Sequence, residues 1–162
     1  MIKIDFDRIV YKERSGFLVS ESDIERIEKE FNIKLPLVLK TFYIEHNGDE
    51  LKTVYVNGID GNEYGIHDIS PIKYKRKYLK GSYYPEIAKE GEFEWSVRLF
   101  SKYECIKRLN LIPFACDEGG DIYCWQKATE SVFIIRSDDF DNAIKVFDSI
   151  DVFFEEYSNN AK

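Results

Sequence analysis

Three apolar segments separated by turn residues, in the second half of the chain, restrict the fold most strongly. Leu111–Ala115 and Asp121–Trp125 are predicted as two strands joined by the turn Asp117-Glu118-Gly119-Gly120, because glycine tolerates the backbone angles of a tight hairpin. Ser131–Ser137 is predicted as a third strand. Its four consecutive apolar residues, 132–135, indicate a central strand that is covered on both faces.

Helices are expected before these strands. Ser22 and Glu25 have the spacing of a capping box, which predicts a helix over about residues 22–31. Proline suits the first position of a helix, so a second helix is predicted from Pro36 to about Asn47.

Other elements are predicted with less support from local patterns. They are strands over Leu51–Val56, Tyr64–Ile69 and Ala143–Phe147, a helix somewhere in residues 97–109, and a terminal helix that Ser149 caps. Residues 71–108 show no clear pattern as a whole. Helices at both ends of a run of strands indicate an α+β fold, and 162 residues favour one domain that spans residues 1–162.

The composition narrows the classes of partner. A formal net charge of −7 disfavours direct binding of nucleic acid and favours basic partners. No apolar segment approaches the roughly 18 residues that a membrane span needs, and the charged first residues are unlike a signal peptide, so a soluble cytoplasmic protein is expected. The three cysteines form no CxxC pair, which favours free thiols, with a Cys116–Cys124 pair across the hairpin as the alternative.

Three groups of residues carry a resemblance to a known family. They are Ile27-Glu28 to Phe31 with Leu35-Pro36-Leu37-Val38-Leu39-Lys40-Thr41-Phe42-Tyr43 and Asn47-Gly48; Ile112-Pro113-Phe114-Ala115 with Asp117, Gly119-Gly120-Asp121 and Tyr123-Cys124; and Ser149-Ile150-Asp151-Val152-Phe153-Phe154. Together these segments resemble the SUKH superfamily, which includes fungal cell-wall assembly regulators and many bacterial immunity proteins. Asp49 and Ile150 depart from the family pattern, and residues 71–108 match no part of it.

The resemblance implies an α+β fold with a mixed or mainly antiparallel sheet flanked by helices. It also implies that Leu35, Pro36, Phe42, Phe114 and Gly120 build the fold and take no part in chemistry. Bacterial members act mainly by binding toxins, often nucleases. An immunity protein that neutralises a cognate toxin stoichiometrically, with no cofactor and no reaction of its own, is therefore the leading hypothesis. A regulatory interaction module of the cell-wall type is the alternative, and nothing in the sequence indicates the oligomeric state.

Several polar groups suggest chemistry of their own. Asp117, Glu118 and Asp121 have the ligand type that a divalent cation needs in a metal-dependent enzyme, but a polar hairpin turn whose acids face water is the favoured explanation. His46 and His67 lie in no zinc motif. Residues 73–80 interleave five basic residues with tyrosines, a pattern that grips single-stranded nucleic acid or protects the edge of a sheet with lysines.

Acidic residues are concentrated near the C-terminus. Asp138, Asp139 and Asp141 begin a segment, 138–156, in which seven acids accompany one base. These three, with Asp117, Glu118 and Asp121 of the hairpin turn, are the predicted partner-binding residues. A nuclease toxin needs a cationic cleft for phosphate, so complementary charge would speed its capture. A solvated acidic surface with no partner is the alternative.

Overall fold

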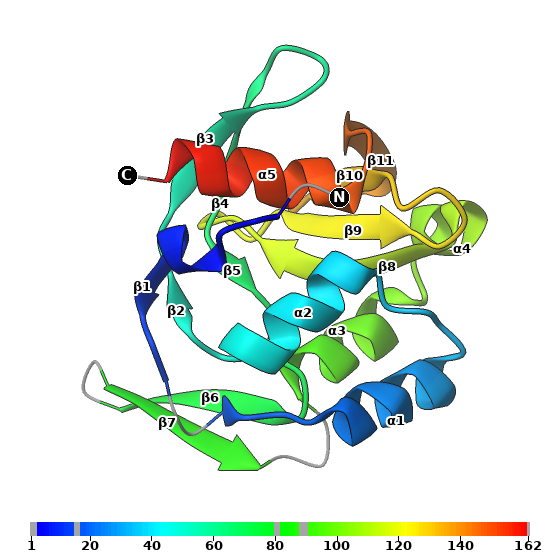
Figure 1. Ribbon diagram of the computed structural model, residues 1–162. Coiled ribbons are helices and arrows are strands. Elements are labelled where there is room, and N and C mark those ends of the chain that lie inside the picture. The colour runs from blue at the N-terminus through cyan, green and yellow to red at the C-terminus, as the bar shows by residue number, and fades with distance from the viewer. Residues whose placement is uncertain (1–2, 15–16, 80–81, 88–90, 162) are drawn as a thin grey trace.

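The computed structural model describes residues 3–14, 17–79, 82–87 and 91–161 (Figure 1). The elements are a 3-10 turn η1 (Phe6–Arg8), β1 (Val10–Lys12), α1 (Glu21–Phe31), α2 (Leu37–His46), β2 (Glu50–Leu51), β3 (Val54–Asn57), β4 (Glu63–Ile66), β5 (Asp68–Ile69), β6 (Tyr74–Leu79), β7 (Ser82–Ile87), α3 (Glu92–Phe100), α4 (Glu104–Leu109), β8 (Leu111–Cys116), β9 (Ile122–Gln126), β10 (Val132–Arg136), β11 (Asp139–Phe147) and α5 (Ile150–Asn160).

The central feature is a five-stranded antiparallel sheet in the order β11-β10-β9-β8-β5. Three two-stranded antiparallel ladders, β1-β2, β3-β4 and β6-β7, accompany it within the described residues. The predicted hairpin of β8 and β9 and the third strand β10 are confirmed. The helices α1 and α2 near the N-terminus and α5 at the C-terminus complete an α+β fold, as the sequence predicted.

The sheet is covered on both faces, which explains the continuous apolar run of β10. Val132 and Ile134 belong to the main core, whereas Ile135 belongs to a smaller cluster beside α4. In the main core, the ring of Phe153 from α5 lies 5.1 Å from that of Phe114, centroid to centroid, and 5.4 Å from that of Tyr123. Alternation along the strands thus divides the apolar residues between two cores. The middle strand is β9, and β10 lies beside it.

Of two predicted helix caps, the one at the start of α1 is formed by other residues and the one at the start of α5 is confirmed. The capping box of α1 is formed by Ser20 and Asp23, not by Ser22 and Glu25. The Ser20 amide donates to Asp23 Oδ2 over 2.9 Å, and the Asp23 amide donates to Ser20 Oγ over 3.4 Å. Ser149 caps α5 as predicted, accepting from the Val152 amide over 3.2 Å. Aspartate can take the position of the expected glutamate because either carboxylate reaches back to the cap amide.

The weakly patterned segments are divided more finely than expected. The predicted strand over 51–56 is two short strands, β2 and β3, and the one over 64–69 is β4, which pairs with β3, and β5, which joins the large sheet. The expected helix in 97–109 is two helices, α3 and α4. The last strand begins at Asp139 and not at Ala143.

Residues 73–79 of the basic stretch form β6 and the residue before it, and residue 80 lies outside the described residues. Lys73 Nζ lies 3.4 Å from Asp23 Oδ2, and the Tyr74 hydroxyl donates to the Leu18 carbonyl over 3.1 Å. These two side chains therefore attach the β6–β7 hairpin to α1 and the segment before it. The remaining side chains of the stretch, apart from the exposed Lys75, lie outside the described residues.

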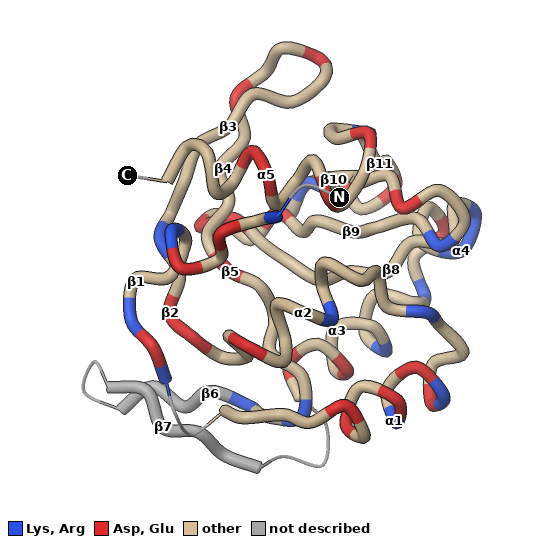
Figure 2. Tube along the Cα trace, in the orientation of Figure 1, with Lys and Arg blue, Asp and Glu red and all other residues tan. Residues whose placement is uncertain are grey.

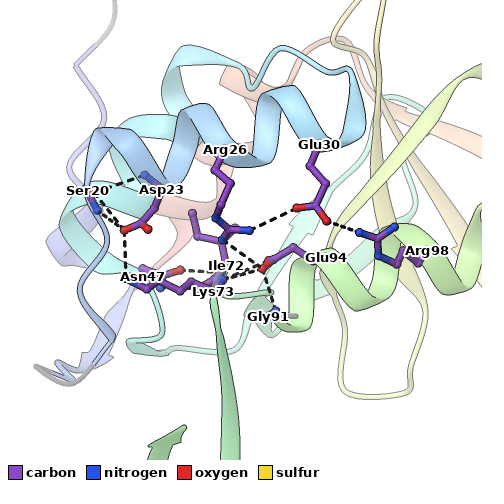
Figure 3. Close-up of polar contacts among 10 residues, drawn as sticks. All are labelled: Ser20, Asp23, Arg26, Glu30, Asn47, Ile72, Lys73, Gly91, Glu94 and Arg98. Carbon is purple, nitrogen blue, oxygen red and sulfur yellow. Dashed lines mark hydrogen bonds and ion pairs between the residues drawn. The ribbon is translucent and has the colours of Figure 1, made fainter. Parts of the chain in front are cut away.

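A polar network joins α1, the base of the hairpin and α3 (Figure 3). The buried Glu94 accepts hydrogen bonds from the Gly91 amide over 2.8 Å and from the Lys73 amide over 3.0 Å. Arg26 lies 4.0 Å from Glu94 and 3.3 Å from Glu30, which also pairs with Arg98 of α3. The network holds α1 and α3 together across the start and end of the hairpin segment.

The three cysteines, Cys105, Cys116 and Cys124, are thiols that take part in no disulfide. Cys116 lies opposite Ile122 in the hairpin and Cys124 opposite Pro113, so the two thiols are not cross-strand partners. Among the helices of the described ranges, none combines the length and apolar character that a bilayer span requires.

Candidate partner-binding site

The turn after β8 and the turn after β10 meet at one end of the large sheet. Ile122 pairs with Ile135, so the turn that ends at Asp121 lies beside the turn that starts at Ser137. Asp121 joins them: its Oδ1 accepts from the Ser137 amide over 2.7 Å, and its Oδ2 accepts from Arg136 Nη1 over 3.0 Å. The structure thus brings together the two groups of acids that the sequence singled out.

Asp117 and Asp121 are both used inside the fold. Asp117 Oδ1 accepts from the Gly119 amide over 2.8 Å and from the Asp121 amide over 2.9 Å, which closes the hairpin turn. Burial raises the pKa of Asp117. Burial also acts to raise the pKa of Asp121, but the Ser137 amide and the Arg136 guanidinium outweigh it and the pKa is lowered. Both carboxylates therefore stabilise the two turns.

The carboxylates suggested for a metal ion point to different partners. Asp121 faces the positive charge of Arg136, whereas Glu118 Oε1 lies 3.3 Å from Thr53 Oγ1 and 3.9 Å from His67 Nδ1. Over the part of the chain that the structure describes, no three His, Cys, Asp or Glu side chains converge on a common point that could hold a metal. The geometry gives the metal-enzyme hypothesis no support.

Four acids of this site are exposed to solvent: Glu118, Asp138, Asp139 and Asp141. Asp139 accepts hydrogen bonds from the Asp141 amide over 3.3 Å and from Asn142 Nδ2 over 2.9 Å, so it also shapes the start of β11. The side chain of Glu118 is 60% exposed. Negative charge is therefore presented by two neighbouring turns on a sheet that holds them in place.

Sequence reasoning missed the residues that support this site. The Arg136 guanidinium lies over the ring of Tyr64, 5.4 Å from its centroid, and the Tyr64 hydroxyl donates to Asp60 Oδ2 over 2.5 Å. The β3–β4 hairpin is thereby attached to the end of the sheet. The hairpin register would have placed Arg136 next to Asp121, but no local pattern relates Tyr64 to either residue.

Comparison with known proteins agrees with the resemblance. The sequence model of the SMI1 / KNR4 family (SUKH-1) matches residues 18–156. A relative from Bacillus subtilis (strain 168), named Immunity protein YxxD, is 31% identical over 84 residues, which cover 51% of this chain and 54% of that protein. The chain therefore spans about half the length of the curated relative it matches.

No solved structure matches the chain. The family match extends from the segment before α1 into α5 and includes the hairpin of β8 and β9. The buried positions of Leu35, Phe42 and Phe114 agree with the structural role that the resemblance implied for them. Because the match covers most of the elements of the fold, the chain belongs to the SMI1 / KNR4 family (SUKH-1).

Proposed function

We propose that this protein is an immunity protein that neutralises a cognate toxin by binding it stoichiometrically. The observation that carries the proposal is the similarity, within the SUKH-1 family, to a protein named as an immunity protein. Such a role needs a stable surface and no catalytic group. The residues that match the family model build the core and the sheet that support such a surface.

The acids at the end of the sheet are the proposed first contact. Glu118, Asp138 and Asp141 are exposed, and the net charge of the chain is −7. A toxin that acts on nucleic acid must present a cationic cleft, so its surface would be complementary in charge. Complementary charge raises the rate of association more than the final affinity. Fast capture matters because one toxin molecule acts on many targets.

Growth rescue tests the proposal. A tagged copy of the chain is recovered from its native cells, and the protein that copurifies in equal amount is identified by mass spectrometry. Each domain of that partner is then expressed alone in a host cell and again together with this chain. We expect one partner domain to stop growth alone and to allow growth when the chain is present. The purified chain should abolish the domain's activity at a one-to-one ratio.

The control is a chain with the same expression level and an altered surface, Ile59→Ser on the β3–β4 turn, which should rescue growth as the wild type does. A partner that leaves growth unaffected when expressed alone, and whose regulation changes when the chain is deleted, would contradict the immunity role. That result would assign the protein to the regulatory alternative of the same family.

A further inference from the structure

The second helix, α2, is apolar around most of its circumference. Six of its ten residues are apolar: Leu37, Val38, Leu39, Phe42, Tyr43 and Ile44. Leu39, Phe42 and Tyr43 are buried in the core, whereas Leu37 is 61% exposed and Ile44 is 37% exposed. The apolar surface of α2 therefore extends beyond the side that packs in the core. The outer side of α2 therefore has the character of a contact surface.

Two grooves flank this outer side. The first, of about 360 Å³, lies between α1 and α2, and Ile24, Leu37 and Ile44 form its apolar part. The second, of about 430 Å³, is lined by the N-terminal segment, α2 and α5, with Ile4, Phe6 and Val38 as its apolar part. Figure 1 shows α2 lying between α1 and α5.

A ridge on α2 separates the two grooves. Leu37, Thr41 and Glu45 line both of them, and their spacing of four residues places them in one row along the helix. The ridge and the two grooves are called the α2 face below. Its shape offers one apolar hollow on each side of a narrow crest, which suits aliphatic side chains from a partner segment that crosses the crest.

The α2 face carries most of the excess negative charge of the protein. Its acids are Glu21, Glu25, Glu28, Glu45, Asp151 and Glu155, and its bases are Lys3 and Lys40. Six acids and two bases leave −4, against −7 for the whole chain. Figure 2 shows acidic positions on α1, α2 and α5.

Most of these carboxylates are not neutralised within the fold. Lys40 Nζ lies 3.4 Å from Glu28 Oε1, and His46 Nε2 lies 3.9 Å from Glu45 Oε2, so two acids of the first groove have a basic neighbour. Among the described side chains, no Lys, Arg or His forms an ion pair with Glu21, Glu25, Asp151 or Glu155. Unpaired acids around an apolar floor are complementary to a segment in which lysine or arginine alternates with aliphatic residues.

We propose that the α2 face binds a basic amphipathic segment of a partner protein, with aliphatic side chains in the grooves and Lys or Arg side chains against the rim acids. The identification of that partner as the toxin rests on the proposed function. The acids at the end of the sheet and the α2 face then have different tasks. Exposed charge sets the rate of capture, whereas apolar residues seated in grooves set the rate of release.

The surface is tested with a synthetic probe, independently of any toxin. The probe is a 14-residue peptide of leucine and lysine with all leucines on one helical face. The control peptide has serine in place of every leucine and the same charge. Backbone amide shifts of the full chain are followed by NMR during titration. We expect shifts concentrated in residues 21–28 and 37–45 with the leucine peptide, and binding at least about tenfold weaker with the serine peptide.

A matched pair of variants tests the apolar contact. Leu37→Ser removes the most exposed apolar side chain of the ridge, and Ile59→Ser removes a comparably exposed one, 52%, from the β3–β4 turn. Leu37→Ser should weaken binding of the leucine peptide about tenfold, and Ile59→Ser should leave it within twofold. Circular dichroism confirms that both variants are folded.

The possible outcomes separate this inference from the proposed function. Equal affinity for the two peptides, no binding at millimolar concentration, or shifts confined to residues 117–121 and 137–141 would overturn the assignment of the α2 face. Peptide binding on the α2 face combined with failed growth rescue would support the surface and reject the immunity role. If rescue succeeds, the affinity of the toxin for the Leu37→Ser variant is compared with its affinity for the wild type. Equal affinities would overturn the assignment of this face to the toxin.

Discussion

The side-chain amide of Asn47 pairs with both backbone polar groups of Ile72. Its Oδ1 accepts from the Ile72 amide over 2.9 Å, and its Nδ2 donates to the Ile72 carbonyl over 3.1 Å and to the Phe17 carbonyl over 2.8 Å. Asn47 is buried and ends α2, so the helix end holds the chain just before the β6–β7 hairpin. This contact explains why asparagine, among the residues that end helices, occupies the position.

Replacing Asn47 with aspartate should destabilise the protein by about 2–4 kcal/mol, because the buried amide donor becomes a carboxylate oxygen facing two carbonyl groups. The free energy of unfolding is measured by urea denaturation. Asn57→Asp, at an exposed position in β3, is the control and should change it by less than about 0.5 kcal/mol. Similar losses of unfolding free energy in both variants would show that the contact with Ile72 contributes no more to stability than an exposed asparagine does.

Gly48, the next residue, is required for two separable reasons. Its φ is 79°, in the left-handed region, and a Cβ at this position would lie 2.3 Å from Phe17 Cγ. Gly61 has a φ of 80° with no atom within 4 Å of its Cβ position, so Gly61→Ala measures the backbone strain alone, about 1–2 kcal/mol. Gly48→Ala should cost at least about 2 kcal/mol more, since Phe17 must move out of the core. Urea denaturation measures the free energy of unfolding of both variants. Equal losses of this free energy would refute the steric explanation.

Elements that depend on local sequence patterns were predicted well. The Asn47-Gly48 helix end, the Gly119-Gly120 turn and the Ser149 cap are local patterns, and each was predicted close to its observed place. The same reasoning chose Ser22 in place of Ser20 for α1, since both serines precede an acid three residues later.

Residues 71–108 were not predictable because distant side chains organise them. Asn47 fixes the chain at Ile72, and Glu94 fixes it at Lys73 and Gly91. The first two pairs are separated by 25 and 21 residues and show no local spacing, whereas Gly91 and Glu94 have the three-residue spacing of a capping box. The α2 face was missed for a related reason: Leu37 stands in the motif that explains Leu39 and Phe42 as core, Ile44 directly follows that motif, and only the packing shows which apolar residues remain outside.

His46 makes the stability of the fold depend on pH. Its Nδ1 lies 2.9 Å from Asp49 Oδ2, and its Nε2 lies 3.5 Å from Asp7 Oδ1 and 3.9 Å from Glu45 Oε2. The hydrogen bond with Asp49 raises the pKa of His46 above its ordinary value of 6.5; burial opposes the shift, and the charges of the three acids add to it. The folded protein therefore binds this proton more tightly than the unfolded chain does.

The stabilisation from protonated His46 is fully present below pH 6.5 and is lost as the pH rises through the higher pKa of the folded state. His46→Gln removes the titrating group, so the difference in free energy of unfolding between wild type and variant should shrink from pH 6 to pH 8 or above. Urea denaturation at several pH values measures it. His67→Gln, at the other and exposed histidine, is the control for the substitution itself. A difference that does not change with pH would show that Asp49 does not hold a charged imidazole.

Charge reversal at the end of the sheet tests the role of the exposed turn acids. The variant carries Asp138→Lys, Asp139→Lys and Asp141→Lys, all at exposed positions. Charges at the edge of an interface change mainly the rate at which the partners meet. Association with the toxin domain should therefore slow by about tenfold or more at low salt, with a smaller change in the dissociation rate. Stopped-flow kinetics at several salt concentrations measures both rates. In the wild type the association rate should fall steeply as salt rises, and in the variant this slope should flatten.

The matched control reverses three exposed acids elsewhere in the chain, Glu13, Glu63 and Glu104, and so changes the net charge of the protein equally. If position matters, this control slows association less than the triple variant at the sheet end. Urea denaturation must show both variants folded, and Asp121 is left intact because its bonds to Arg136 and Ser137 hold the two turns together. Equal slowing in both variants would mean that only total charge attracts the partner, and an unchanged rate in both would remove the sheet end from the encounter altogether.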